Sequence, residues 1–177
     1  MYVKEEKGVL VVERKLPLFI VTGASGSGKT FVIKELRRIL PDFDIFDPDH
    51  LVEFIGHDWE KMRNIWLRVA RNIAQGGRMT ILCGTMMPWD IEKCVDFPFF
   101  DHVYYINLHC NEEIREQRLR ERNWSDEEIE NHKHFAKRLL EIADEAYSPP
   151  MPTVDTSNTD VTEVASQIKE WVLQYAY

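Results

Sequence analysis

The chain has 177 residues, of which 44% are hydrophobic, a size and composition typical of a single globular domain. Its formal net charge of -8 argues against nucleic-acid binding, which usually requires a basic surface. No apolar stretch reaches the length of a membrane span, and the first residues lack the apolar core of a signal peptide. The cysteines form no Cys-x-x-Cys pair, which disfavours structural zinc and disulfides. We therefore expect a cytoplasmic monomer or homodimer without nucleic-acid or membrane partners.

The hydrophobic pattern predicts strands that alternate with helices along one domain, residues 1–177. Residues 1–15 are expected to form an N-terminal extension or an edge strand, with strand character near 9–13. Short apolar runs between turn residues predict further strands at 18–21, 43–46, 79–83, 102–108 and 153–155. Helical spacing predicts helices at about 30–40, 50–75, 131–146 and 162–175, with shorter ones from 90 and from 111. This alternation is typical of a parallel sheet with helices on both faces and ligands at the carboxyl ends of its strands.

The most specific motif follows the first of these buried strands. Residues 23–30 match the phosphate-binding loop pattern Gly-x4-Gly-Lys-Ser/Thr at every fixed position. The backbone N–H groups of such a loop and of the next helix form a positive cradle for phosphate oxygens. Lys29 would lie over the β- and γ-phosphates, and the Thr30 hydroxyl would bind Mg²⁺. The predicted nucleotide-binding residues of the loop are Gly23, Ala24, Ser25, Gly26, Ser27, Gly28, Lys29 and Thr30.

Two other classes of nucleotide-binding protein are disfavoured. A regulatory GTPase needs an Asp-x-x-Gly segment and an Asn-Lys-x-Asp segment, and neither string occurs in the sequence. The third core strand runs into Cys83-Gly84-Thr85 without the carboxylate that many P-loop proteins place there. This absence, together with the short chain, disfavours an AAA-type ATPase acting on macromolecules. A nucleotide-binding module without catalysis is the remaining alternative to an enzyme.

An arginine-rich segment at 118–122 follows the fourth core strand and reads Arg-Leu-Arg-Glu-Arg. Together with the early phosphate loop, the short chain and the strand signals, it resembles the small P-loop kinases. This group includes nucleoside and nucleoside-monophosphate kinases, shikimate and gluconate kinases, and chloramphenicol phosphotransferase. Within it, the layout of Asp47-x-Asp49, Cys83-Gly84-Thr85 and the arginine segment is most similar to bacterial nucleoside/nucleotide kinase-like proteins. The resemblance covers roughly residues 17–175.

The resemblance implies a three-layer α/β fold: a five-stranded parallel sheet of order 2-3-1-4-5, helices on both faces, and a small mobile lid over about residues 115–135. It also implies ATP as the donor, Mg²⁺ as the cofactor, and transfer of the γ-phosphoryl group to a small-molecule acceptor. A nucleoside or nucleoside monophosphate is the favoured acceptor. Another small alcohol, such as a sugar acid, a shikimate-like compound or an antibiotic, is the alternative.

Three arginines are spaced for one face of the helix after the fourth core strand: Arg115, Arg118 and Arg122 lie at i, i+3 and i+7. In the family, lid arginines close over the triphosphate. Here Arg118 and Arg122 match best and are predicted to be catalytic, and Arg118 also to contact the nucleotide. A solvated helix with arginines paired to glutamates is the alternative, and residues 123–130 are the predicted mobile insert.

The segment Thr156-Ser157-Asn158 follows the fifth core strand, where the family places its adenine-binding loop, and Ser157 and Asn158 are its predicted nucleotide contacts. Their polar groups would contact the edge of the base. The alternative is the ordinary start of a helix, capped by Thr159 or Asp160.

Two carboxylates, Asp47 and Asp49, follow the second core strand on the expected ligand side of the sheet. A carboxylate there would orient or deprotonate an acceptor hydroxyl, or hold a Mg²⁺-bound water. Asp49 is the more probable cap of the next helix on sequence grounds, which favours Asp47 as the site residue. Both are predicted to be catalytic.

The remaining predicted substrate contacts lie on neighbouring segments. Gly84 would allow a substrate to approach closely, and the Thr85 hydroxyl would bond to it; an ordinary turn is the alternative. Arg63, ahead of Arg68 and Arg71, would clamp a phosphorylated acceptor from the long helical region. Solvation at the surface is the alternative for these arginines.

Overall fold

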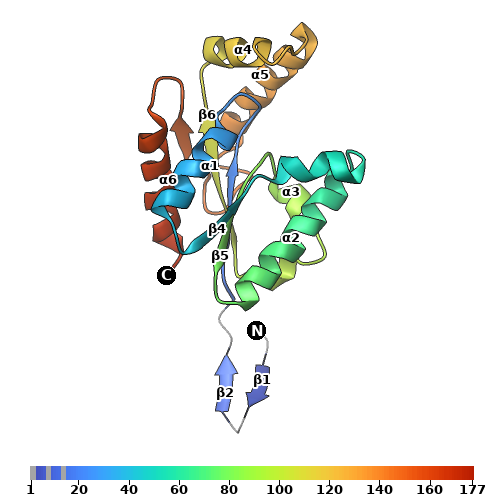
Figure 1. Ribbon diagram of the computed structural model, residues 1–177, viewed down its shortest axis with the longest axis vertical. Helices are drawn as coiled ribbons and strands as arrows, with labels where there is room; N and C mark the ends of the chain where they lie inside the picture. Colours follow the sequence, from blue (N-terminus) through green and yellow to red (C-terminus); the bar gives the residue numbers. More distant parts are fainter. Residues whose placement is uncertain (1–2, 7–8, 13–14) are drawn as a thin grey trace.

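The computed structural model describes residues 3–6, 9–12 and 15–177 (Figure 1). Its main sheet has five parallel strands in the order β4-β5-β3-β6-β7. Their bounds are β3 (Leu18–Thr22), β4 (Phe43–Phe46), β5 (Met79–Cys83), β6 (Val103–His109) and β7 (Thr153–Asp155). Numbered along the chain within this sheet, the order is 2-3-1-4-5, which confirms the predicted fold.

A separate antiparallel hairpin precedes the sheet. It consists of β1 (Val3–Glu6) and β2 (Val9–Val12), with Val3 opposite Val12. The strand predicted near 9–13 corresponds to β2, and residue 13 lies outside the described residues.

Strand β3 lies at the centre of the main sheet, and all of its residues are buried. Its continuous apolar run follows from this position, because helices cover both faces of a parallel sheet. Phe19 and Val21 pack into one core cluster, whereas Leu18 and Ile20 pack into the other, as the two-residue period of a strand requires. Val21 pairs with both Cys83 and Ile106, so the segments after β3, β5 and β6 emerge at the same edge.

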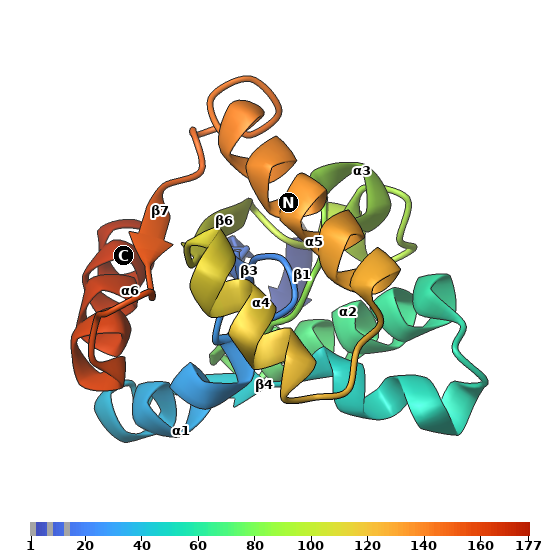
Figure 2. The same cartoon turned by 90° about the horizontal axis from the view of Figure 1, so that it is seen from above.

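Helices form the outer layers, as Figures 1 and 2 show. On one face, α1 (Lys29–Ile39) packs beside α6 (Val161–Tyr175). On the other face lie α2 (Trp59–Gln75), the short α3 (Pro88–Ile91) and η2 (Phe97–Phe99). Above the carboxyl ends of the strands lie α4 (Glu112–Arg120) and α5 (Asp126–Glu141) (Figure 2). Within the described residues, none of the helices combines the length and apolar character that crossing a membrane needs.

Two of the predicted helices differ from the structure, in which the second runs from Asp126 to Glu141 and not over 131–146. The helix expected at 50–75 is two elements, the 3-10 helix η1 (Pro48–Ile55) and then α2, separated by residues with positive φ at Gly56 and His57. The expected helix at 131–146 begins earlier, at Asp126. A reciprocal cap causes this early start, because the Ser125 hydroxyl accepts from Glu128 N and the Glu128 carboxylate accepts from Ser125 N. The segment predicted to be a mobile insert, 123–130, is therefore helical from Asp126 onward.

The cysteines are all free and buried. Burial raises the pKa of the Cys83 thiol at the end of β5 far above its ordinary value. Cys110 follows β6, and its Sγ lies 3.5 Å from the carbonyl oxygen of Gly26. These thiols therefore occupy interior positions next to the sheet and the phosphate loop.

A buried carboxylate joins α2 to η2. Asp96 is 4% exposed and accepts hydrogen bonds from Arg68 Nε and from Arg71 Nη1, the latter at 2.7 Å. The Arg71 guanidinium also lies 5.2 Å from the centre of the Phe99 ring. Arg68 and Arg71 thus bind Asp96, and through it they link α2 to the η2 segment.

Replacing Asp96 with Asn is expected to lower the free energy of unfolding by about 1–3 kcal/mol at neutral pH, because two guanidinium groups lose their charged partner. Burial alone would raise the pKa of Asp96, but the hydrogen bonds from Arg68 and Arg71 hold it below its ordinary value. A depressed folded-state pKa contributes stability above the unfolded-state pKa and loses it as pH falls through the folded-state value. Urea unfolding should therefore show the penalty at pH 7 and a smaller one near pH 3, whereas the exposed Asp101→Asn control should match the wild type at both.

Candidate active site

The phosphate loop, residues 23–30, connects β3 to α1 in a conformation that its first glycine makes possible. Gly23 has a φ of 145°, and a Cβ there would lie 2.4 Å from the Leu108 carbonyl oxygen and 2.7 Å from Ser27 Oγ. The Thr85 hydroxyl donates to the Gly23 carbonyl oxygen at 2.8 Å. Thr85, predicted to contact substrate, therefore supports the loop in this structure.

Lys29 is the only lysine of the loop and is 8% exposed. Its Nζ donates to the carbonyl oxygens of Gly23 and Ala24, at 2.7 and 3.2 Å. Burial lowers the pKa of Lys29 to about 8; the charge of Asp49 opposes this shift, and that of Arg115 adds to it. The ammonium is therefore poorly hydrated and sits within its own loop, where an anionic phosphate would stabilise its charge.

Arginines of α4 hold the phosphate loop through its backbone carbonyl groups. Arg115 is fully buried and donates to the carbonyl oxygens of Ser25 and Cys110, at 2.7 and 3.0 Å. Arg118 donates to Gly26 O at 2.9 Å and to Thr156 O at 3.0 Å. Helix α4 ends at Arg120, so the prediction that Arg122 shares its face is wrong.

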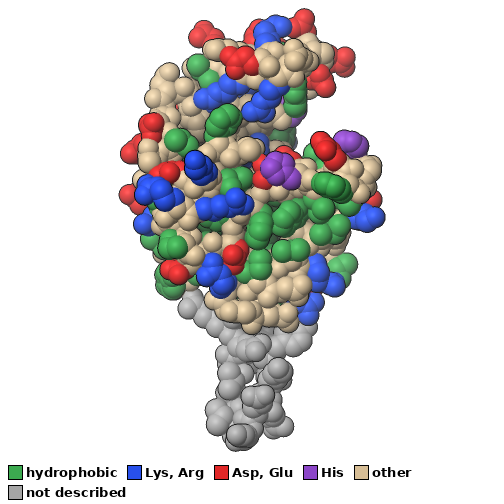
Figure 3. Space-filling view, viewed as in Figure 1, with side chains coloured by type: hydrophobic (Ala, Val, Ile, Leu, Met, Phe, Trp, Pro, Cys, Tyr) green, Lys and Arg blue, Asp and Glu red, His purple; other side chains and the backbone are tan. Residues whose placement is uncertain are grey.

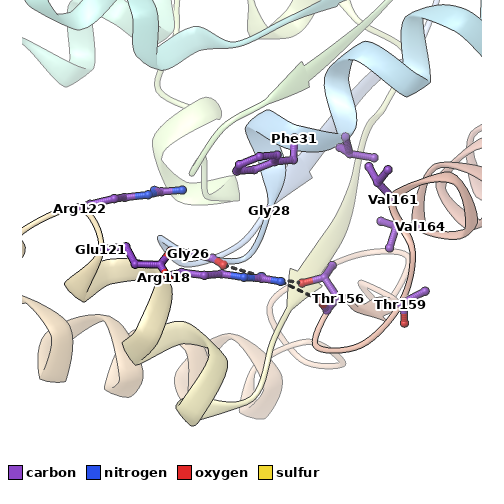
Figure 4. A pocket seen from close by; sticks show the side chains of 11 residues that line it. Gly26, Gly28, Phe31, Arg118, Glu121, Arg122, Thr156, Thr159, Val161 and Val164 are labelled. Atoms are coloured by element: carbon purple, nitrogen blue, oxygen red, sulfur yellow. Dashed lines mark hydrogen bonds between the residues drawn. The ribbon is translucent and has the colours of Figure 1, made fainter.

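A cavity of about 540 Å³ opens beside the loop (Figure 4). One side is apolar and includes Phe31, 74% exposed, with Val161 and Val164 of α6. The other side carries guanidinium groups, and Figure 4 shows Arg122 extended towards the Phe31 ring. Aromatic and apolar surface facing arginine suits a flat heterocycle such as a nucleobase. The residues that line the cavity are Gly26, Gly28, Phe31, Val32, Arg118, Glu121, Arg122, Thr156, Thr159, Val161 and Val164.

The segment after β7 reaches this cavity through other residues than those predicted. Thr156 and Thr159 line it, whereas Ser157 and Asn158 do not. The Ser157 hydroxyl donates to Asp155 at 2.6 Å and accepts from Asn111 N at 2.9 Å. Phe31 was missed because it lies outside any motif, and Thr159 was considered only as a helix cap.

Asp47 connects the phosphate loop to the segment after β4. Its Oδ2 accepts from the Thr30 hydroxyl at 2.9 Å, and its Oδ1 accepts from Asp49 N at 3.1 Å. Asp47, and not Asp49 as predicted, caps the next helix. A hydroxyl and a carboxylate in contact at the end of a phosphate loop are oxygen donors suited to Mg²⁺.

Asp49 stands next to this pair at an exposed position. Partial removal from water raises the pKa of its carboxyl; the charge of Lys29 opposes the shift, and that of Asp47 adds to it. A carboxylate with a raised pKa is a better proton acceptor than an ordinary one.

Pro48 separates the two aspartates and packs on Gly84. A Cβ on Gly84 would lie 2.9 Å from Pro48 Cγ and 3.0 Å from Cδ. Gly84 was predicted to let a substrate approach closely because it has no side chain. In the structure the Pro48 ring occupies that space.

We expect Gly84→Ala to lower the free energy of unfolding by about 1–3 kcal/mol, because the rigid proline ring must move. The shift would displace both flanking aspartates, so turnover should fall as well. Gly76→Ala, at the end of α2, is the control for turnover: its Cβ would meet the Ile73 carbonyl oxygen at 3.2 Å and neither Pro48 nor the aspartates. Equal urea midpoints for Gly84→Ala and wild type would contradict this role for Gly84.

Arg63 of α2 faces α3. Its Nη2 lies 3.5 Å from Asp90 Oδ1, and its buried Nε has no hydrogen-bond partner among the described residues. Trp66 packs on Phe46 with ring centres 5.0 Å apart and donates to the Pro48 carbonyl oxygen. Figure 3 shows a hollow in the surface between helices α4 and α5 on one side and η1 and α2 on the other.

The fold and the loop together define a P-loop protein of the small-kinase type. A family model described as an AAA domain matches residues 20–141, more than half of the chain. The chain therefore belongs to this family. The family description, AAA domain, is also the name of the ATPase class that the sequence disfavours. The sheet order of this chain is nevertheless that of the small P-loop kinases.

Individual known proteins agree with this assignment. An adenylate kinase isoenzyme 6 homolog from Plasmodium falciparum is 24% identical over 195 residues, covering 93% of this chain and all of the relative. The structure of shikimate kinase from Acinetobacter baumannii, 20% identical, has a TM-score of 0.58 and covers 92% of this chain and 95% of its own. A gluconokinase from Sinorhizobium meliloti, 16% identical, has a TM-score of 0.59, with coverages of 92% and 95%. The predicted class, a P-loop phosphotransferase, is thereby confirmed.

Proposed function

We propose that the chain transfers the γ-phosphoryl group of ATP to a hydroxyl of a small molecule, with a nucleoside as the favoured acceptor. The observation that carries this proposal is the hydrogen bond between Thr30 and Asp47. It joins the phosphate loop to a pair of carboxylates at one edge of the sheet. Donor phosphates and an acceptor hydroxyl would meet there.

The donor side is formed by the loop and the cavity beside it. Loop N–H groups and Lys29 would bind the phosphates, and the base would lie between Phe31 and Arg122. Arg118, now bonded to loop and β7-segment carbonyls, lies close enough to the cavity to exchange a carbonyl for a phosphate oxygen. Mg²⁺ held by Thr30, with Asp47 beside it, would supply further positive charge to the phosphates.

The acceptor side favours a hydroxyl over a phosphate. A phosphorylated acceptor needs free guanidinium groups, but Arg68 and Arg71 are bound to Asp96, and Arg63 lies near Asp90. Asp49, by contrast, offers a carboxylate with a raised pKa that would take the proton of an attacking hydroxyl. Lys29 and the lid arginines would offset charge on the migrating phosphoryl group.

A nucleoside monophosphate is the second candidate acceptor, because the curated relative is named as an adenylate kinase homolog. The names of the shikimate kinase and the gluconokinase support a small alcohol. Arg63 distinguishes the classes, since its replacement by Ala should abolish turnover of a phosphorylated acceptor and leave a neutral one largely unaffected.

Release of ADP from Mg·ATP, measured against a panel of nucleosides, nucleoside monophosphates and small alcohols, tests the proposal. We expect one nucleoside to raise ADP release well above the rate without acceptor, with an equal amount of phosphorylated product. ADP release that no acceptor stimulates would contradict a kinase function.

A further inference from the structure

A histidine of the lid contacts the phosphate loop. His132, on α5, lies with its Nδ1 3.3 Å from the backbone nitrogen of Ser25, which donates to it. Trp124 and Phe135 pack on the same imidazole, with ring centres 5.0 and 6.4 Å from it. These contacts fix the ring over the loop, and neither the sequence motifs nor the proposed mechanism uses it.

The contact defines which form of the imidazole is present. A nitrogen that accepts a hydrogen bond carries no proton, so Nδ1 is unprotonated in this structure. The surroundings agree: burial lowers the pKa of His132, and the charges of Lys29 and Arg115 lower it further, while Glu128 opposes them. Those three charged groups come from the loop end of α1, from α4 and from α5 itself.

An anion arriving at the loop would change this arrangement. The Ser25 N–H belongs to the group of loop donors that would face phosphate oxygens. A neutral Nδ1 is an acceptor and cannot bond to a phosphate oxygen, which is also an acceptor. Arginine side chains at the same loop are permanent donors and face no such conflict.

We propose that His132 is a proton-linked contact of the donor site. In the nucleotide-free chain it accepts from Ser25 N–H; when the triphosphate binds, it takes up one proton from the solvent and donates to a phosphate oxygen. This inference rests on the proposed binding of a nucleoside triphosphate at residues 23–30.

The sign of the pH dependence follows from the charges. Phosphate next to the imidazole raises the pKa of His132 above its value in the empty chain. Protonation therefore favours binding fully at pH values below the empty-state pKa, and this advantage is lost as pH rises through the higher bound-state pKa. Donor affinity should thus increase towards mildly acidic pH.

Titration calorimetry with Mg·ATP in two buffers of different ionisation enthalpy measures the proton uptake directly. His132→Asn keeps an acceptor oxygen for Ser25 N–H but cannot titrate. The control is His134→Asn on the same helix, because His134 is exposed and its Nε2 lies 3.2 Å from Glu130. Nitrogen NMR of the His132 ring in the wild type, with and without Mg·ADP and Mg·ATP, provides a readout that needs no variant.

We expect the wild type and His134→Asn to take up more protons than His132→Asn. The gain in affinity as pH is lowered from 8 should be larger in the wild type than in His132→Asn, and the difference should approach about three- to tenfold below the empty-state pKa, as a pKa rise of half to one unit gives. Equal proton uptake in wild type and His132→Asn, or an imidazole pKa that nucleotide leaves unchanged, would overturn this inference and leave the proposed function intact. Absence of Mg·ATP binding to the wild type would overturn the proposed function and the inference with it.

Discussion

Replacing Lys29 with Ala is expected to reduce kcat/KM by about three orders of magnitude, because a single charge aimed at the migrating group is removed. Lys29 is nearly buried and bonded only to loop carbonyls, so its charge has no carboxylate partner within the loop. The exposed Lys34→Ala on the same helix is the matched control and should retain wild-type turnover. A Lys29→Ala enzyme with a near-normal rate would contradict the proposed role.

The same residue predicts an alkaline limit to activity. The profile of kcat/KM against pH reports groups of the free enzyme, and the pKa of Lys29 is lowered to about 8 there. The charged form is the active one, so kcat/KM should fall as pH rises through about 8. An arginine at this position, which stays charged, should shift that decline upward even if its absolute rate is lower.

The second large effect is expected at the aspartate pair. Asp47→Asn should lower kcat/KM by about 10²- to 10³-fold and raise the Mg²⁺ concentration needed for half-maximal rate, because the amide has one acceptor oxygen in place of two and loses the charge beside Thr30. Asp49→Asn should lower kcat by about 10²- to 10⁴-fold without that change in Mg²⁺ requirement, because it removes the proposed base.

Steady-state rates at several Mg²⁺ concentrations separate the two roles. Asp42→Asn, exposed before β4, is the control and should match the wild type. The pKa of Asp49 is raised in the folded chain, so activity should fall as pH drops through it, and Asp49→Asn should lack this acidic decline. Identical Mg²⁺ profiles for Asp47→Asn and wild type would exclude a metal role for Asp47.

The fold was predictable from the sequence because its signals are local. Apolar runs between turn residues place β4, β5 and β7 at their predicted bounds, and the alternation of strands and helices implies the parallel sheet. Two signals were misread. The Ser125–Glu128 cap moves the start of α5, and Gly56, the left-handed C-cap of η1, ends that helix where helical spacing continues.

The site was predictable only where a contiguous motif exists. Residues 23–30 are such a motif, but the cavity needs Phe31 and Val161 to meet across 130 positions of chain. The one available signal was Phe31 itself, a large apolar side chain at a solvent-facing position of an amphipathic helix. His132 carried no signal, because its contact with Ser25 depends on how α5 lies over the sheet.

The buried thiols make opening of the donor site measurable without any engineered probe. Alkylating reagents attack thiolates that solvent reaches, so a folded chain reacts only through fluctuations that expose them. Exposure of Cys110 requires its contact with Gly26 of the loop to separate, whereas exposure of Cys83 requires disruption of the central sheet. The ratio of the two alkylation rates therefore distinguishes a breathing motion of the nucleotide side from complete unfolding.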